Sequence, residues 1–206
     1  MTPAGRRETP ERVLQATVRS LAAHGYAKTT ARSIAATGGF APGVIYYHFS
    51  DLDAALVATA EYTSGAREVR YRAELLGVTS AVTLIDKLRV LYDEDAASGH
   101  IEAVQELVAA ARPGSALAAV VAAQTQRWET LAEQVLRDIL RGSPLARLVK
   151  VAVLARAAVA YYLGLQTLTH LDGDANRPRA AFDQAARLAT AFDKLPKLRR
   201  TRRISD

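Results

Sequence analysis

The sequence predicts an all-α fold, and two observations lead to that prediction. Apolar residues recur every three or four positions along almost the whole chain, which is the period of an amphipathic helix, and no segment shows the alternation of a strand. Glycine, proline and hydroxyl residues interrupt this pattern at intervals of helical length. Half of the 206 residues are hydrophobic, so the chain can bury a sizeable core.

The first fifty residues predict three helices. Thr9, followed by a proline, is typical of a helix start, and Gly25 is typical of a helix end. A shorter helix is expected over about residues 29–38, where a pair of glycines ends it. A second short helix is expected over about residues 42–49.

The rest of the chain predicts six longer helices, because capping residues and helix breakers divide it into suitable segments. They are expected over about residues 51–77, 82–98, 101–112, 115–140, 143–170 and 181–195. The segment "DGDANRP", residues 172–178, is expected to form a loop. We place a three-helix N-terminal domain at residues 1–52, a helical C-terminal domain at 53–195 and a basic tail at 196–206.

The composition excludes several kinds of chemistry. The chain has no cysteine, so disulfides, zinc–cysteine sites and thiol catalysis are excluded. Because no nucleophile motif, phosphate loop or metal-ligand spacing is found, we expect no catalytic residues, no metal site, no cofactor and no enzymatic activity. The first residues contain no apolar run of signal-peptide length, and a cytoplasmic location is expected.

Positive charge is concentrated at the two ends of the chain. Residues 1–50 carry six basic and two acidic side chains, a net charge of +4, and residues 194–206 carry six basic and one acidic, a net charge of +5. The middle, with fifteen basic and eighteen acidic side chains, has a net charge of −3. Basic segments suit a polyanion such as nucleic acid. The alternative is a solvated surface and a disordered tail that bind nothing.

One segment, residues 151–165, is apolar on almost every side of its expected helix. At fifteen residues it is too short to cross a membrane, and Arg156 in its middle carries a charge that is costly in lipid. A helix that is apolar all round is buried all round. Small residues such as Ala155 and Gly164 permit a second helix to approach closely, so we expect a partner subunit to cover this segment in a homodimer.

Residues 29–49 have the arrangement of a helix-turn-helix. Two short helices are joined by a tight turn with glycine, and in such a motif the second helix enters the major groove of DNA. Ile45 and Phe49 lie four residues apart on one face and are expected to point into the core. Tyr46 and Tyr47 lie off this face; their hydroxyls suit phosphates and their rings suit sugars or thymine methyl groups. The alternative for each tyrosine is ordinary packing with a satisfied hydroxyl.

The segment "GYAKTTARSIAATGGFAPGVIYYHFSDLDAAL", Gly25 to Leu56, resembles the DNA-binding domain of the TetR family of transcriptional regulators. The matching residues are Gly25, Tyr26, Thr29, Thr30, Ile34, Ala35, Gly39, Gly43, Leu56 and especially "IYYHF" at 45–49. The motif covers the first quarter of the chain. Beyond it the resemblance is architectural, namely an all-helical domain whose last two helices suit pairing.

This resemblance implies a ligand-responsive regulator, usually a repressor, that binds a roughly palindromic DNA operator as a homodimer. A small-molecule effector in the C-terminal ligand-binding and dimerisation domain changes the separation of the two recognition helices and releases the DNA. By position, the implied DNA-binding residues are Thr30, Ala31, Arg32, Pro42, Gly43, Val44, Tyr46, Tyr47 and His48. Arg6 and Arg7 are expected to form an arm for the minor groove. The alternative function is a helical interaction protein whose basic ends bind an acidic partner or a membrane surface.

Three residues depart from the family pattern. Ala41 stands where relatives usually have a small hydroxyl cap, and Leu52 stands at the position of a frequent lysine that contacts phosphate. Gly38 replaces the usual alanine and is expected to loosen the end of its helix by up to about 1 kcal/mol. These changes are expected to weaken DNA affinity rather than abolish binding.

A ligand pocket is expected between helices of the C-terminal domain, mostly apolar with a few polar groups. Because only 6% of the residues are aromatic, a medium-sized apolar ligand is favoured. The candidate ligand contacts are Tyr62, Tyr92, Gln105, Gln124, Trp128 and Tyr161. For each of these side chains the alternative is a place in the core.

Overall fold

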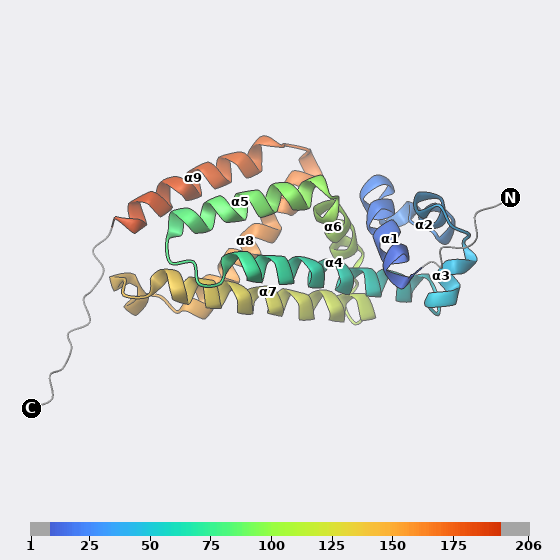
Figure 1. Ribbon diagram of the computed structural model, residues 1–206, viewed down its shortest axis with the longest axis horizontal. Helices are drawn as coiled ribbons and strands as arrows, with labels where there is room; N and C mark the ends of the chain where they lie inside the picture. Colours follow the sequence, from blue (N-terminus) through green and yellow to red (C-terminus); the bar gives the residue numbers. More distant parts are fainter. Residues whose placement is uncertain (1–8, 195–206) are drawn as a thin grey trace, which may run out of the picture. The chain divides into compact units, whose positions relative to one another are not determined.

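The computed structural model describes residues 9–194 and contains, over that range, helices, turns and loops without a strand (Figure 1). The predicted all-α fold class is confirmed. The α-helices are α1 (Pro10–His24), α2 (Ala31–Gly38), α3 (Gly43–His48), α4 (Leu52–Leu75), α5 (Ala81–Ala97), α6 (His100–Ala110), α7 (Ala116–Leu140), α8 (Val151–Asp172) and α9 (Asn176–Asp193), and the 3-10 turns are η1 (Tyr26–Lys28) and η2 (Pro144–Arg147).

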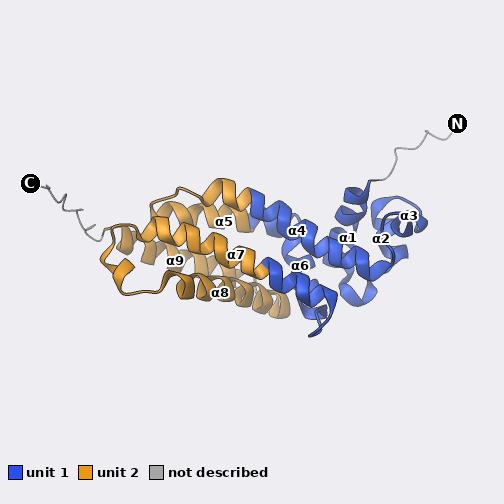
Figure 2. Cartoon of the chain, turned by 90° about the horizontal axis from the view of Figure 1, so that it is seen from below, with its two compact units in different colours: residues 1–69, 93–124 blue, residues 70–92, 125–206 orange. Residues whose placement is uncertain are grey.

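The chain forms two compact units, coloured blue and orange in Figure 2. Unit 1 comprises residues 1–69 and 93–124, and unit 2 comprises residues 70–92 and 125–206. Unit 1 therefore contains α1, α2 and α3 together with α6, while α4, α5 and α7 each contribute residues to both units. The predicted domains are continuous segments that end at residues 52 and 195, whereas each compact unit combines two separate segments. The domain limits therefore remain a prediction.

Three predicted helix starts are confirmed by side-chain caps. The capping residues are Thr9 before α1, Asp51 before α4 and Ser115 before α7. In each case a side-chain oxygen accepts a hydrogen bond from the backbone N–H three residues later, at 3.3, 2.7 and 3.1 Å respectively. These caps satisfy N–H groups that have no acceptor within the first turn of a helix, which is why the sequence signals were accurate.

The helix predicted over residues 143–170 is wrong at its start. Ser143 Oγ accepts a hydrogen bond from the Leu145 N–H at 3.2 Å and caps only the short turn η2, whereas α8 begins at Val151. Between the two, Lys150 has an extended backbone with ψ 104°, which interrupts the helix. No glycine or proline stands between Leu145 and Val151, so the sequence contains no breaker that signals this interruption.

The loop predicted over residues 172–178 is too long. Helix α8 continues to Asp172, where Gly173 ends it in the left-handed conformation with φ 68°. Helix α9 already begins at Asn176, and Pro178 is buried in its first turn. Proline is tolerated there because the first N–H groups of a helix have no intrahelical acceptor to lose.

Helix α8 is longer than the apolar run that was used to exclude a membrane span. It has 22 residues, and it is the one helix in the described part of the chain that is long and apolar enough to cross a membrane. The argument from length is therefore wrong, because the helix continues past residue 165. The argument from charge remains, since Arg156 lies 3.5 Å from the Glu129 carboxylate of α7 and both charges are unfavourable in lipid.

The N-terminal helices of unit 1 pack around one apolar cluster. Its buried members are Val13, Ala16, Ile34, Ile45 and Ala55, which come from α1, α2, α3 and α4. Leu52 is half-buried and packs against this cluster. The residue at the position of the family's frequent lysine therefore fixes the start of α4 to the core, which leaves no side-chain donor for a phosphate there.

Unit 2 has its own core. The buried members are Tyr71, Leu75, Leu84, Leu91, Leu131, Val135 and Ile139. The rings of Tyr71 and Trp128 meet edge to face with centroids 5.1 Å apart. The Asp193 carboxylate accepts hydrogen bonds from the Ala81 and Val82 N–H groups at 2.9 and 3.1 Å, so the end of α9 caps the start of α5.

Candidate nucleic-acid interface

A tight turn joins α2 to α3. Gly39 ends α2 in the left-handed conformation with φ 70°, a backbone geometry in which glycine carries no steric cost. Pro42 directly precedes α3, and its ring fixes a backbone φ that suits the start of a helix. The result is the predicted helix-turn-helix, with its second helix displayed at the end of the turn.

The inner face of α3 holds the motif to unit 1. Ile45 is completely buried, and Phe49 packs half-buried against the same cluster. The two residues are four positions apart and therefore share a helix face. Their predicted inward orientation is confirmed.

The outer face of α3 carries the two tyrosines. Tyr46 is 56% exposed and Tyr47 is 83% exposed, although tyrosine side chains in folded proteins are usually at least partly buried. His48 is half-buried, and its ring lies edge to face against that of Tyr47 with centroids 4.9 Å apart. Pro42 and Gly43 are exposed and Val44 is half-buried. The outer face thus offers hydroxyls, rings and small apolar groups to a partner.

The start of α2 is organised by its own hydroxyls. Thr30 Oγ1 accepts a hydrogen bond from the Ser33 N–H at 3.1 Å, and Ser33 Oγ accepts one from the Thr30 N–H at 2.8 Å, which together form a capping box. Ala31 is half-buried against the apolar cluster, while Arg32 is exposed. Of the three residues predicted here, Arg32 has the longest exposed side chain.

Gly38 is explained by its neighbour Phe40. A Cβ atom at position 38 would lie 2.0 Å from the ring of Phe40, which packs against the apolar cluster. Glycine therefore gives space to an aromatic anchor of the turn, which offsets the helix propensity that alanine offers at this site. Arg6 and Arg7, and the basic tail at residues 196–206, lie outside the described residues.

These helices define the class of the protein as a helix-turn-helix DNA-binding protein. Residues 13–59 match the family model described as "Bacterial regulatory proteins, tetR family". The match covers most of α1, all of α2 and α3, and the start of α4. Residues 13–59 therefore form a DNA-binding domain of the TetR family of bacterial regulatory proteins.

Several solved transcriptional regulators are similar to the chain over most of its length. FadR from Bacillus subtilis, in complex with stearoyl-CoA, has a TM-score of 0.73 and 14% identity, covering 89% of this chain and 99% of that chain. A TetR transcription regulator from Haloarcula marismortui has a TM-score of 0.68 and 18% identity, covering 89% and 95%. SmeT, the repressor of the Stenotrophomonas maltophilia multidrug efflux pump SmeDEF, has a TM-score of 0.65 and 18% identity, covering 90% of both chains.

These identities are low, and the similarity to the solved structures shows the fold alone. No curated protein matches the chain in sequence. Nothing in the solved structures therefore assigns an effector or an operator to this chain.

Three of the predicted ligand contacts lie in unit 1. Tyr62 is half-buried, and its hydroxyl lies 3.2 Å from Gln15 Nε2 of α1. Gln105 is buried on α6. Gln124 is half-buried on α7, and its side-chain oxygen is buried without a hydrogen-bond partner. Tyr62 thus connects α4 with a helix of the DNA-binding motif, whereas Gln124 offers an unused acceptor.

The other three predicted ligand contacts lie in unit 2. The ring of Tyr92 is buried and lies edge to face with that of Phe182, with centroids 5.5 Å apart. Trp128 packs against Tyr71 in the core. Tyr161 is instead exposed on α8. The structure therefore distributes the six predicted residues over two units and several environments.

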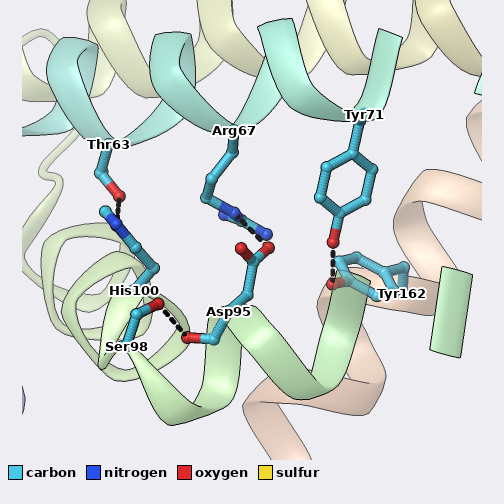
Figure 3. Close-up of polar contacts among 7 residues, drawn as sticks. All are labelled: Thr63, Arg67, Tyr71, Asp95, Ser98, His100 and Tyr162. Atoms are coloured by element: carbon cyan, nitrogen blue, oxygen red, sulfur yellow. Dashed lines mark hydrogen bonds and ion pairs between the residues drawn. The ribbon is translucent and has the colours of Figure 1, made fainter. Parts of the chain in front are cut away.

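A line of polar contacts along α4 was missed in the sequence (Figure 3). In unit 1, Arg67 Nε donates to Asp95 Oδ2 at 2.6 Å, and both side chains are buried. The Thr63 hydroxyl is hydrogen-bonded to His100 Nδ1, at the first residue of α6. Thr63 and Arg67 are four residues apart and therefore share one face of α4. Two polar residues at this spacing could have indicated a buried polar contact, but the search for apolar residues at helical spacing did not consider them.

In unit 2, a similar contact joins the Tyr71 hydroxyl to that of Tyr162 at 3.3 Å (Figure 3). Among residues 9–194, no three histidine, aspartate or glutamate side chains could together hold a metal ion. Figure 3 also shows the Ser98 hydroxyl, which donates a hydrogen bond to the Asp95 backbone carbonyl at 3.1 Å.

A second polar link in unit 1 joins α6 to the DNA-binding motif. Glu106 Oε2 accepts a hydrogen bond from the Tyr26 N–H at 2.7 Å, directly after α1 ends. Gly25 has φ 75°, and a Cβ atom there would lie 3.2 Å from the same carboxylate oxygen. Glycine therefore permits both the left-handed turn and the close approach of Glu106.

We expect Glu106→Ala to loosen this link. A hydrogen bond to a charged acceptor contributes about 1.5–3 kcal/mol, so the Tyr26 amide of the variant should exchange with solvent about 10- to 100-fold faster. Residue-resolved hydrogen exchange on the full chain measures this. Glu106→Gln keeps an acceptor at the same place and is the matched control; equal Tyr26 exchange in the wild type and the alanine variant would contradict the expectation.

Proposed function

We propose that the chain is a repressor that binds a palindromic operator as a homodimer and is released from it by a small molecule in the cytoplasm. The observation that carries this proposal is the outer face of α3, where Tyr46 and Tyr47 are exposed while Ile45 fixes the helix from behind. We assign operator contacts to Thr30, Ala31, Arg32, Pro42, Gly43, Val44, Tyr46, Tyr47 and His48.

Helix α8 supports the homodimer. Only 17% of its most apolar 18-residue window is buried within the single chain. Leu154, Tyr161 and Leu168 are exposed and follow one another at intervals of seven residues, which places them on one face. Leu171 on α8 and Leu188 on α9 are exposed as well. An exposed apolar surface of this kind is typical of a protein interface, and we assign Tyr161 to it rather than to the ligand site.

The solved relatives support a small-molecule effector. FadR from Bacillus subtilis was solved in complex with stearoyl-CoA, and SmeT is the repressor of a multidrug efflux pump. By analogy, we propose an apolar or amphipathic small molecule for this chain. In this chain, the unpartnered oxygen of Gln124 is a suitable acceptor for a ligand donor, because a buried polar atom without a partner is unfavourable. We therefore propose an apolar effector with at least one hydrogen-bond donor, and we retain Tyr62, Tyr92, Gln105 and Trp128 as further candidates.

The links of unit 1 support a route for release. His100 joins the start of α6 to α4, and Glu106 joins the same helix to the Tyr26 amide beside α1. A displacement of α6 by an effector therefore acts on the helices that support α3. In this route α6 has one position with effector bound and another without it. The free energy available for release from DNA equals the difference in the effector's binding free energy between these two positions.

A nuclease footprint over the gene of this protein and its neighbours tests the proposal. We expect one protected palindrome whose half-sites are separated by a whole number of helical turns, about 10.5 base pairs each. Protection should decrease as the salt concentration rises. Basic side chains that bind phosphates displace counterions from the DNA, and this release is less favourable at high salt. A protein that protects no sequence at this locus but binds anionic vesicles would support the alternative of a basic interaction protein.

A further inference from the structure

We infer that the start of α3 reads thymine methyl groups in the operator rather than the hydrogen-bonding edges of the bases. This inference rests on the proposed function, because it concerns the same helix in the same groove. It adds the chemical class of the half-site, namely A·T pairs that present their thymine methyl groups in the major groove under residues 41–44.

The first observation is the composition of the turn. Residues 38–45, "GGFAPGVI", contain no side chain that can donate or accept a hydrogen bond. Within this stretch, Ala41, Pro42 and Gly43 are exposed, and Val44 is half-buried. In a helix-turn-helix the first residues of the second helix contact base edges. The groups that this chain places there are methyl, methylene and backbone groups.

The second observation is that three hydroxyls near the start of α2 form hydrogen bonds within the protein. Those of Thr30 and Ser33 form the capping box of α2. The Thr29 hydroxyl is buried and donates to the Gly25 carbonyl at 2.8 Å. The tyrosines lie further along α3, where phenolic hydroxyls suit phosphates. Arg32 is therefore the exposed side chain of α2 best suited to a guanine, and it lies outside the apolar turn.

The third observation is the open space around Gly43. No atom lies within 4 Å of a Cβ built at this residue, and its φ is outside the positive range. Glycine is therefore not needed here for folding, since alanine fits the same backbone and favours a helix. A bare backbone at this point lets α3 approach the DNA closely enough for methyl groups to be in van der Waals contact, which requires about 4 Å between carbon atoms.

Replacement of thymine by uracil tests this inference, because the two bases differ only in the methyl group. Duplexes that bind the full chain are first selected from a random pool. Each thymine of the selected half-sites is then replaced by uracil in turn. We expect at least one replacement per half-site to weaken binding about fourfold, the value of one buried methyl group. Replacements outside the half-sites are the control and should change nothing.

Two variants connect the methyl effect to α3. Val44→Ala removes two methyl groups, and in this variant the sensitive uracil replacement should no longer weaken binding. Gly43→Ala should keep the melting temperature and weaken binding to every duplex, because its Cβ atom holds the helix away from the bases. If no uracil replacement in either half-site weakens binding, the inference is overturned although the protein binds DNA; if no duplex is selected at all, the proposed function fails with it.

Discussion

Leu168→Glu is expected to make the protein monomeric and to weaken operator binding at least about 100-fold. Leu168 is 50% exposed and lies in the apolar row of α8 with Leu154 and Tyr161. In a twofold interface the substitution occurs twice, so two carboxylates are buried close together without partners. A monomer then binds each half-site separately and loses the gain of about 100- to 10,000-fold that linked sites provide.

Sedimentation and operator titration of the same samples measure this effect. Val90→Glu is the matched control, since Val90 is an exposed apolar residue of α5 in the same unit and does not belong to the row on α8. It should leave both the dimer and the affinity unchanged. A wild-type protein that sediments as a monomer, or a Leu168→Glu variant that remains dimeric, would show that α8 is not the subunit interface.

Asp95→Ala is expected to have the largest effect on stability. The substitution leaves the buried guanidinium of Arg67 without its 2.6 Å partner, and removal of one member of a buried ion pair costs about 3–5 kcal/mol. Replacement of both residues by leucine should restore much of this loss, because an apolar pair has no charge to desolvate. Urea unfolding at constant pH gives both free energies.

The control for this prediction is Asp93→Ala on the same helix. Asp93 is exposed, so its loss should change the free energy of unfolding by no more than about 0.5 kcal/mol. If Asp95→Ala and Asp93→Ala are equally stable, the pair of Arg67 with Asp95 does not stabilise the fold. In that case the double leucine variant should also show no recovery.

The sequence predicted the helix-turn-helix well because its signals are local. Caps such as Asp51, the left-handed Gly39 and the four-residue spacing of Ile45 and Phe49 depend on neighbours within one or two turns. The start of α8 could not be predicted, because the extended backbone of Lys150 has no breaker beside it. Propensity alone does not locate such a break.

The residues of the candidate sites could be predicted where they depend on local helix geometry and could not where they depend on contacts between distant segments. The exposure of Tyr46 and Tyr47 follows from helix geometry and the position of Ile45. The contact between Arg67 and Asp95 joins residues of different helices, and that of Glu106 with the Tyr26 N–H spans 80 residues of sequence. Such pairs depend on tertiary packing, which the periodicity of a single helix does not contain.

Operator affinity of Tyr47→Ala, measured beside its melting temperature, shows whether the outer face of α3 binds DNA. Tyr47 is 83% exposed, so its truncation should change the free energy of unfolding by no more than about 0.5 kcal/mol. Loss of its hydroxyl and ring contacts should weaken operator binding about tenfold or more. Tyr47→Phe should retain the part of the operator affinity that the aromatic ring contributes. Unchanged operator affinity, with or without a fall in melting temperature, would show that the outer face of α3 does not bind DNA.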